Sequence, residues 1–159
     1  MDLYMKQHIF SWGDSFDIYD SDGNTVFTVE GEIFTFGKKL HLYDLANTEL
    51  AYIEQELLTF LPKYRIYRDG EELCEIVKEF TFFHPEYTVT GDGMDWTVQG
   101  DFFDHDYSVV SGDRTVATVS KEWMTWGDAY CIWIDSSIDH VAALSVVLVI
   151  DACLDAQRN

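Results

Sequence analysis

The residues with the clearest potential for chemistry lie in one short acidic segment that contains a histidine. Asp101, Asp104, His105 and Asp106 fall within six consecutive residues. This spacing could supply carboxylate and imidazole ligands to a metal ion, or an acid–base pair to an enzyme. The alternative, which we favour, is an ordinary solvated turn between two strands of an acidic protein. These four residues are therefore the only candidate site that the sequence offers.

A second acidic segment resembles the beginning of a calcium-binding loop. Asp20, Asp22 and Asn24 have the alternating spacing of the first ligands in such a loop. However, Thr25 stands where the loop requires glycine, and Gly31 stands where it requires a bidentate glutamate. We therefore interpret this segment as a hairpin turn.

An acidic residue also recurs at similar intervals along the chain. The positions are Glu32, Glu56, Glu79, Asp101 and Glu122. They could form a ring of carboxylates, but the adjacent Lys78 and Lys121 favour ordinary cross-strand pairing instead.

The remaining nucleophilic and titratable residues give no catalytic pattern. Three cysteines lack the spacing of a metal site or a disulfide, and we interpret them as small buried hydrophobic residues: Cys74, Cys131 and Cys153. Four further histidines stand alone and receive no role: His8, His41, His84 and His140. The sequence also lacks a phosphate-binding glycine loop, a nucleophile elbow and an HExxH motif. We therefore predict no catalytic residue, cofactor or metal.

An internal repeat indicates which elements position these residues. One pattern, clearest at residues 51–66 and 74–89, returns around positions 8, 32, 56, 79, 101 and 122, in steps of 24, 24, 23, 22 and 21 residues. Gly, Asn and Asp pairs typical of tight hairpins separate the copies. Gly, Pro or acidic breaks, each after an aromatic residue, divide every copy into two strand-like segments. Six such units predict about twelve strands with antiparallel neighbours, because the connections are short.

A meander of about twelve strands is expected to close into a barrel, since closure removes the exposed edges. The interior of such a barrel is too wide for its own side chains to fill. Ile138–Leu154 can fill it, because this segment reads as a helix with apolar residues on every face. Ser136 or Ser137 is the expected N-cap, with Asp139 in the first turn. The predicted fold is a mainly β closed antiparallel barrel around a buried hydrophobic C-terminal helix.

Length and composition predict a single domain over residues 1–159, with the barrel at about 3–135 and the central helix at about 137–155. The longest apolar run, Val141–Ile150, is about half the ~20 residues that a membrane-spanning helix needs, so we expect no integral membrane protein. The first seven residues lack the apolar stretch of a signal peptide, and the isolated cysteines suit a reducing compartment. We therefore expect a cytoplasmic protein.

The most unusual feature of the composition is its negative charge. The chain has 29 acidic and 10 basic residues, a formal net charge of −19. Such a charge repels phosphate backbones and anionic lipid surfaces, so nucleic acid is not an expected partner. A further hypothesis is that the acidic surface is an adaptation to high salt.

The chain also resembles a known family over essentially its whole length. The segments that carry the resemblance are Leu3–Gln7, Val29–Glu32, Lys39–Asp44, Leu57–Tyr64, Lys78–Phe83, Ser120–Trp123 and Val146–Asp151. They are similar to the LURP-one-related family, a branch of the Tubby C-terminal-like superfamily that also includes the phospholipid scramblases. The resemblance implies a twelve-stranded barrel around a central hydrophobic helix. Relatives in the superfamily bind phosphoinositides or are associated with lipid movement, but no binding residue carries over, because lysines and arginines are sparse and scattered along this sequence.

Two hypotheses about function follow. The first, which we prefer, is a non-catalytic binding or tethering module that engages a protein or lipid partner, as a monomer or weak oligomer. The second is an enzyme or small-ligand carrier that uses a shallow pocket at one barrel mouth, where the carboxylates of Asp101–Asp106 would have to converge. The predicted central helix favours the first hypothesis, because it occupies the space of a deep ligand site.

The high-salt hypothesis gives a prediction about stability. If the acidic surface is a salt adaptation, the free energy of unfolding should rise between dilute buffer and molar salt, because salt screens the repulsion among carboxylates. Urea denaturation at several salt concentrations measures this change. A protein that is no less stable in dilute buffer would contradict the hypothesis.

Overall fold

The fold was analysed in a computed structural model, which describes residues 1–6, 15–32, 36–80 and 83–158. Within these residues the chain forms twelve strands followed by one helix. The strands are β1 (Asp2–Lys6), β2 (Ser15–Tyr19), β3 (Thr25–Gly31), β4 (Lys39–Tyr43), β5 (Glu49–Gln55), β6 (Lys63–Arg68), β7 (Glu71–Glu79), β8 (Glu86–Gly91), β9 (Met94–Asp101), β10 (Asp106–Ser111), β11 (Arg114–Met124) and β12 (Gly127–Ile134). The helix is α1 (His140–Arg158).

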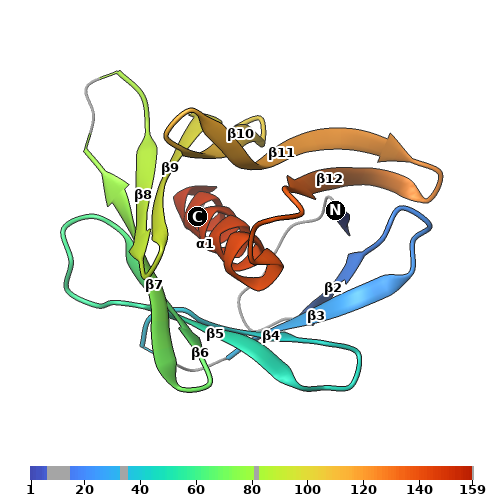
Figure 1. Ribbon diagram of the computed structural model, residues 1–159, viewed down its shortest axis with the longest axis horizontal. Helices are drawn as coiled ribbons and strands as arrows, with labels where there is room; N and C mark the ends of the chain where they lie inside the picture. Colours follow the sequence, from blue (N-terminus) through green and yellow to red (C-terminus); the bar gives the residue numbers. More distant parts are fainter. Residues whose placement is uncertain (7–14, 33–35, 81–82, 159) are drawn as a thin grey trace.

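The strands form a closed barrel in which each strand pairs with its sequence neighbours, and the circle is completed between β1 and β12. All of these pairings are antiparallel. Along the closing pair the register runs from Asp2 opposite Trp133 to Lys6 opposite Ala129. Figure 1 shows the barrel wall around the helix. The predicted mainly β barrel with antiparallel neighbours is therefore confirmed.

Alternating side chains explain why these segments form the wall. In β6, Tyr64 and Ile66 are buried, whereas Lys63 and Arg65, which alternate with them, are only partly buried. Successive side chains of a strand point to opposite faces, so one face packs against the core and the other meets solvent. Lysine and arginine can therefore stand in a strand of this barrel without entering its interior.

Tight turns join the strands at one end of the barrel, which we call the tight-turn end. These turns connect β2 to β3, β4 to β5, β6 to β7, β8 to β9 and β10 to β11. Each contains a residue with positive φ: Gly23, Asn47, Asp69 and Gly70, Gly93, and Gly112. The backbone of Gly70, at φ 79°, shows why glycine suits these turns, since a side chain there would strain the chain.

The opposite end of the barrel, which we call the crown end, carries the other set of connections. They join β3 to β4, β5 to β6, β7 to β8, β9 to β10 and β11 to β12. Because the strands run alternately up and down, these connections must lie at the end opposite the tight turns. Two neighbouring connections are held together there, since the backbone N–H of Lys38 donates to the side-chain oxygen of Gln55 at 3.1 Å.

Helix α1 fills the interior of the barrel. Every residue from Ala142 to Ile150 is buried, so no face of this part of the helix meets solvent. Figure 1 shows the helix enclosed by the strands. The predicted buried C-terminal helix is confirmed. Among the described residues, no helix combines the length and apolar character needed to cross a membrane.

The helix begins later than its sequence suggested. It spans His140–Arg158 rather than about 137–155. Asp139 is the cap, because its Oδ1 accepts hydrogen bonds from the backbone N–H groups of Val141 and Ala142 at 3.0 and 3.2 Å. The prediction of Ser136 or Ser137 as N-cap is wrong. The hydroxyl and the backbone N–H of Ser137 both donate to Asp135 instead, in the turn that precedes the helix.

Ion pairs fix the helix start at the tight-turn end. Arg68 at the end of β6 donates two hydrogen bonds to the carboxylate of Asp139, at 2.6 and 2.8 Å. Arg114 at the start of β11 lies 2.8 Å from the carboxylate of Asp135. The pKa of Asp135 falls to about 2 because Ser137 and Arg114 donate hydrogen bonds to its carboxylate. Both arginines thus bind the short segment that turns the chain from the wall into the interior.

The buried position of Val147 gives a prediction about folding. Val147 is 2% exposed within the helix. Val147→Asp should prevent folding, because an unpaired buried carboxylate costs more than the whole stability of about 5–15 kcal/mol that a domain of this kind has. The milder Val147→Ala should fold and lose about 2 kcal/mol in urea denaturation. A soluble V147D variant that melts cooperatively would contradict the filled interior.

Candidate functional site

The candidate histidine of the acidic segment is part of the core. His105 lies in the connection from β9 to β10 with φ 52°, and its side chain is buried. The ring stacks on Tyr130 of β12 with centroids 4.2 Å apart. Its Nε2 lies 3.7 Å from Oδ1 of Asp151 on α1. These contacts tie the connection to the helix and to the wall.

The three carboxylates of the same segment are exposed. They belong to Asp101, Asp104 and Asp106. Oδ1 of Asp101 accepts a hydrogen bond from the backbone N–H of Asp104, as in an ordinary turn. Asp104 also lies 4.0 Å from Lys121. The structure therefore leaves the carboxylates on the surface and buries the histidine, and no group of three or more His, Cys, Asp or Glu side chains within the described residues could hold a metal ion.

The segment that resembles a calcium loop is a hairpin turn. Oδ1 of Asp20 accepts hydrogen bonds from the backbone N–H groups of Asp22 and Asn24, at 3.0 and 2.9 Å. The same two ends are joined by a bond from the backbone N–H of Asp20 to the carbonyl of Asn24 at 2.9 Å. The carboxylate that would bind calcium is thus used to close the turn between β2 and β3.

The cysteines are buried thiols in an apolar setting. All three are free. Burial raises the pKa of Cys74 to about 12 and that of Cys153 to about 11, and it also raises the pKa of Cys131. Because only the thiolate is strongly nucleophilic, these environments disfavour catalysis by cysteine. They agree with the prediction of small buried hydrophobic residues.

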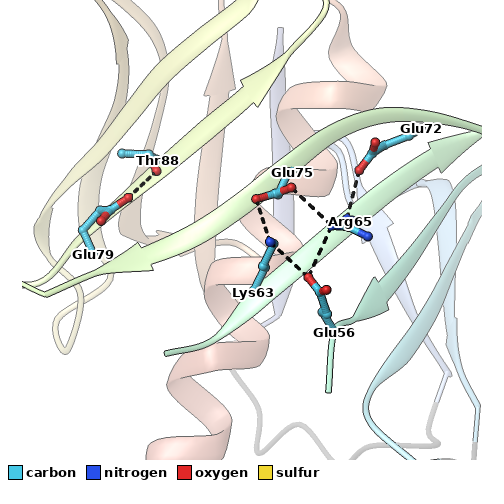
Figure 2. A network of polar contacts seen from close by, with 7 residues as sticks. All are labelled: Glu56, Lys63, Arg65, Glu72, Glu75, Glu79 and Thr88. Carbon is cyan, nitrogen blue, oxygen red and sulfur yellow. Dashed lines mark hydrogen bonds and ion pairs between the residues drawn. The ribbon is translucent and has the colours of Figure 1, made fainter. Parts of the chain in front are cut away.

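The recurring acidic residues stand on the outside of the barrel and pair across strands where the structure gives them partners. Glu56 lies 3.2 Å from Lys63 and 3.4 Å from Arg65. Lys63 also lies 3.2 Å from Glu75, and Arg65 lies 3.1 Å from Glu72. Figure 2 shows this network on the outer face of β6 and β7. In the same view, the hydroxyl of Thr88 donates to Glu79 at 2.8 Å. Contacts with neighbouring strands therefore account for Glu56 and Glu79 without a ring of carboxylates.

His41 is a lone histidine to which the structure gives an unusual setting. Nδ1 lies 2.7 Å from Glu49 and Nε2 lies 2.9 Å from Glu32. Only the imidazolium has an N–H on both nitrogens, so both contacts are satisfied when the ring is protonated. Partial burial acts to lower the pKa of His41, but the hydrogen bonds that its ring donates to Glu49 and Glu32 outweigh burial and raise it. His8 lies outside the described residues, and His84 is exposed.

His41 lines a groove of about 700 Å³ on the outer wall formed by β4, β5 and β6. We call it the aromatic–acidic groove; its lining residues are Glu32, Lys39, His41, Glu49, Ala51, Tyr52, Glu54, Tyr67, Asp69 and Gly70. The register places His41 opposite Tyr52 and Tyr52 opposite Tyr67. The ring centroids in this row are 4.9 and 5.9 Å apart. The groove therefore combines a row of rings with several carboxylates.

A second surface feature is a set of exposed apolar side chains at the crown end. We call it the apolar crown; its members, each about half exposed or more, are Phe36, Leu57, Leu58, Phe60, Phe80, Phe83, Phe103 and Trp123. They lie in, or directly beside, the five connections that define this end. At the tight-turn end, by contrast, Leu45 is the exposed apolar residue of a turn. Exposed apolar side chains gathered in one place are typical of an interaction surface.

Basic residues are also unevenly distributed. The sequence has six lysines, and all of them lie in the crown half of the wall or its connections: Lys6, Lys38, Lys39, Lys63, Lys78 and Lys121. The prediction that basic residues are scattered therefore holds along the sequence but is wrong in space. At the tight-turn end, Arg68 and Arg114 are already paired with Asp139 and Asp135. The tight-turn end therefore has acidic turns without lysines, whereas carboxylates and lysines occur together in the crown half.

Sequence reasoning missed both surfaces. For the crown, a signal was present, because apolar residues such as Phe60 and Phe83 fall within or beside the breaks that divide each repeat. For the groove no local signal exists, since His41, Tyr52 and Tyr67 meet only through the register of three strands.

The contacts of His41 give a prediction about pH. Its pKa is raised in the folded state, so its ion pairs stabilise the fold fully below the unfolded pKa of about 6.5. This contribution to the free energy of unfolding is below about 1 kcal/mol, because the carboxylates are partly exposed. It should disappear as the pH rises through the folded-state pKa of His41. Urea denaturation between about pH 5.5 and 8.5 should show the loss in the native chain but not in His41→Gln. The exposed His84→Gln is the control, and an equal effect of both substitutions would contradict the assignment.

The model of the family described as LURP-one-related matches residues 1–151 of this chain. The chain is 35% identical over 154 residues to the uncharacterized protein YxjI of Bacillus subtilis (strain 168), covering 97% of this chain and 94% of that protein. It also resembles an X-ray structure of a protein from Arabidopsis thaliana, with a TM-score of 0.70 and 18% identity over 96% of this chain and 90% of that one. At that identity the likeness to the plant protein concerns the fold alone. The family model and the bacterial relative show that the chain belongs to the LURP-one-related family.

Proposed function

We propose that this protein is a non-catalytic tethering module that docks on a lipid surface through its apolar crown. The observation that carries the proposal is the placement of the exposed apolar side chains. Phe36, Phe60 and Phe83 are 91, 97 and 94% exposed, and each comes from a different connection at the same end of the barrel. A fold does not leave such side chains in water without cost, because burying one phenylalanine is worth about 1.5–3 kcal/mol.

A lipid surface fits the crown better than a protein partner does. The crown side chains come from separate connections rather than from one strand or helix face. A protein partner would need a matching pocket for each of them, because protein interfaces pack as densely as protein interiors. Fluid acyl chains fill the space between separate apolar tips without any such match.

The distribution of charge supports the same orientation. A net charge of −19 repels anionic surfaces, which argues against docking by electrostatic attraction. However, the lysines in the crown half offset carboxylates there, as Lys63 does for Glu56 and Glu75. The tight-turn end, with its acidic turns, would face away from the surface. Apolar insertion does not depend on attraction between opposite charges, so it is consistent with the acidic composition.

The interior of the barrel supports a role without catalysis. Helix α1 occupies the space in which a deep ligand site would lie. The buried thiols have raised pKa values, and the carboxylates of Asp101–Asp106 do not converge on His105. These observations favour a module that acts through its outer surface.

Flotation with vesicles of zwitterionic phosphatidylcholine tests the proposal. The native protein should float with the vesicles, and each of Phe36→Ser, Phe60→Ser and Phe83→Ser should weaken the partition about tenfold, the change that corresponds to ~1.4 kcal/mol. The triple variant should not float. Leu45→Ser, a similar change at the tight-turn end, should behave as the native protein, and thermal melts should confirm that all variants fold.

Two further measurements separate lipid docking from other modes of binding. Trp123 is 77% exposed in the crown, so brominated acyl chains should quench its fluorescence if it enters the bilayer. Raising the salt concentration should not weaken the partition, because apolar insertion is not screened. Binding that occurs only on anionic vesicles and disappears in salt would refute docking through the crown. A co-purifying protein whose binding requires the three phenylalanines would show that the partner is a protein.

A further inference from the structure

The aromatic–acidic groove has the size and lining of a ligand site. Its volume of about 700 Å³ lies within the ~300–1,000 Å³ that small-molecule sites span. It extends along the outer wall from Lys39, the first residue of β4 at the crown end, to Asp69 and Gly70 in the turn at the other end. It therefore lies outside the filled interior, and it borders the apolar crown only at the start of β4.

The charges of the groove favour a cation. Its lining includes the carboxylates of Glu32, Glu49, Glu54 and Asp69, against which stand the basic residues Lys39 and His41. A cleft lined mainly by one sign of charge, with walls of low dielectric, concentrates the field and attracts counter-ions. The rings of Tyr52 and Tyr67 supply such walls here. The groove thus focuses a negative potential along its length.

The same carboxylates act on two tyrosines at the groove. Burial raises the pKa of Tyr52 to about 12, with further contributions from Glu54 and Glu32. Burial also raises the pKa of Tyr43, which lies beside His41, with contributions from Glu49, Glu30 and Glu32. Burial disfavours a charge of either sign, but the contributions from the glutamates reflect a negative potential that favours a positive charge at the same place.

His41 shows which kind of cation the groove accepts. As an imidazolium it places one N–H on Glu49 and one on Glu32, and its ring lies 4.9 Å from that of Tyr52. When His41 is protonated, its ring is a flat organic cation that lies between two carboxylates and an aromatic ring. A metal ion would prefer a shell of oxygen ligands alone, and the described residues offer no group of carboxylate, histidine or cysteine side chains that could provide one.

We propose that the aromatic–acidic groove binds an organic cation whose protonated amino groups are carried on an alkyl chain. The alkyl segments lie against Tyr52 and Tyr67, and the ammonium groups face Glu54, Asp69 and Glu49. Lysine-like chains combine the same two parts, an apolar stem and a charged head. The same chemistry is present in a free polyamine and in the lysine side chains of a peptide. We assign the site to the free polyamine, which a groove of about 700 Å³ can accommodate.

Spermidine is the probe for the first test, with the full-length protein and without vesicles. Isothermal titration should show one saturable site, and the NMR signals of the His41 and Tyr52 rings should shift along the same curve. Glu54→Gln and Glu49→Gln should each weaken binding about fivefold, the loss expected for one partly exposed ion pair. Asp113→Asn removes the same charge from an exposed turn outside the groove and should change the affinity less than about twofold.

A second pair of variants tests the aromatic wall. Tyr52→Leu should weaken spermidine binding, whereas Tyr52→Phe should retain it, because the phenylalanine keeps the ring without the hydroxyl. A trilysine peptide with blocked ends distinguishes the source of the amine. Tighter binding of the peptide, with the same dependence on Glu54 and Tyr52, would support the site and assign it to a peptide ligand.

Counter-ion binding to the whole acidic surface is the result that would overturn the proposal. In that case Asp113→Asn and Glu54→Gln would weaken binding equally, and the signal shifts would spread over carboxylates at the tight-turn end. Absence of a saturable site in both titrations would overturn it as well. Neither result bears on docking through the crown, which is measured by flotation.

Discussion

The need to fill a wide barrel is the constraint on which the rest of this structure depends. Twelve strands enclose more space than the inward side chains of the wall can occupy. Helix α1 supplies the missing volume with residues that are buried on every face, from Ala142 to Ile150. The wall and the helix therefore cannot fold into this arrangement independently. Arg68, paired with Asp139, and Lys38, which donates from the crown end to the carbonyl of Ala152 at 3.1 Å, hold the helix near its two ends.

A filled interior moves function to the outside of the barrel. The polar groups that do lie inside serve the packing, as His105 does by stacking on Tyr130 beside Asp151. The outer surface is free to vary, because alternation along each strand places every second side chain in solvent. On this surface the two ends differ in character, with apolar residues and lysines at the crown end and acidic turns at the other. Because its two ends differ, the barrel can bind a surface in one defined orientation. A tethering module requires such an orientation.

The sequence predicted those features that depend on neighbouring residues. The strands, the tight turns and the apolar helix each have a local pattern, and the pattern led to the closed barrel. The start of the helix was misplaced because Ser137 and Asp139 can both cap, and only the position of Arg68 across the barrel decides between them. Strand register, which no single segment encodes, brings His41 together with Tyr52 and Glu49. It also places His105 beside Asp151 in the interior. The spatial grouping of the lysines escaped notice for the same reason.

The two proposed surfaces are compatible in one orientation of the molecule. If the crown rests on a lipid surface, the wall formed by β4, β5 and β6 stands upright above it, and the aromatic–acidic groove runs along that wall toward the tight-turn end. Asp69 and Glu49 then lie at the end of the groove farthest from the lipid, where they remain open to solvent. A cation can therefore enter the groove while the crown is docked. Since Lys39 belongs to the groove and also borders the connection that carries Phe36, the two surfaces meet at the start of β4.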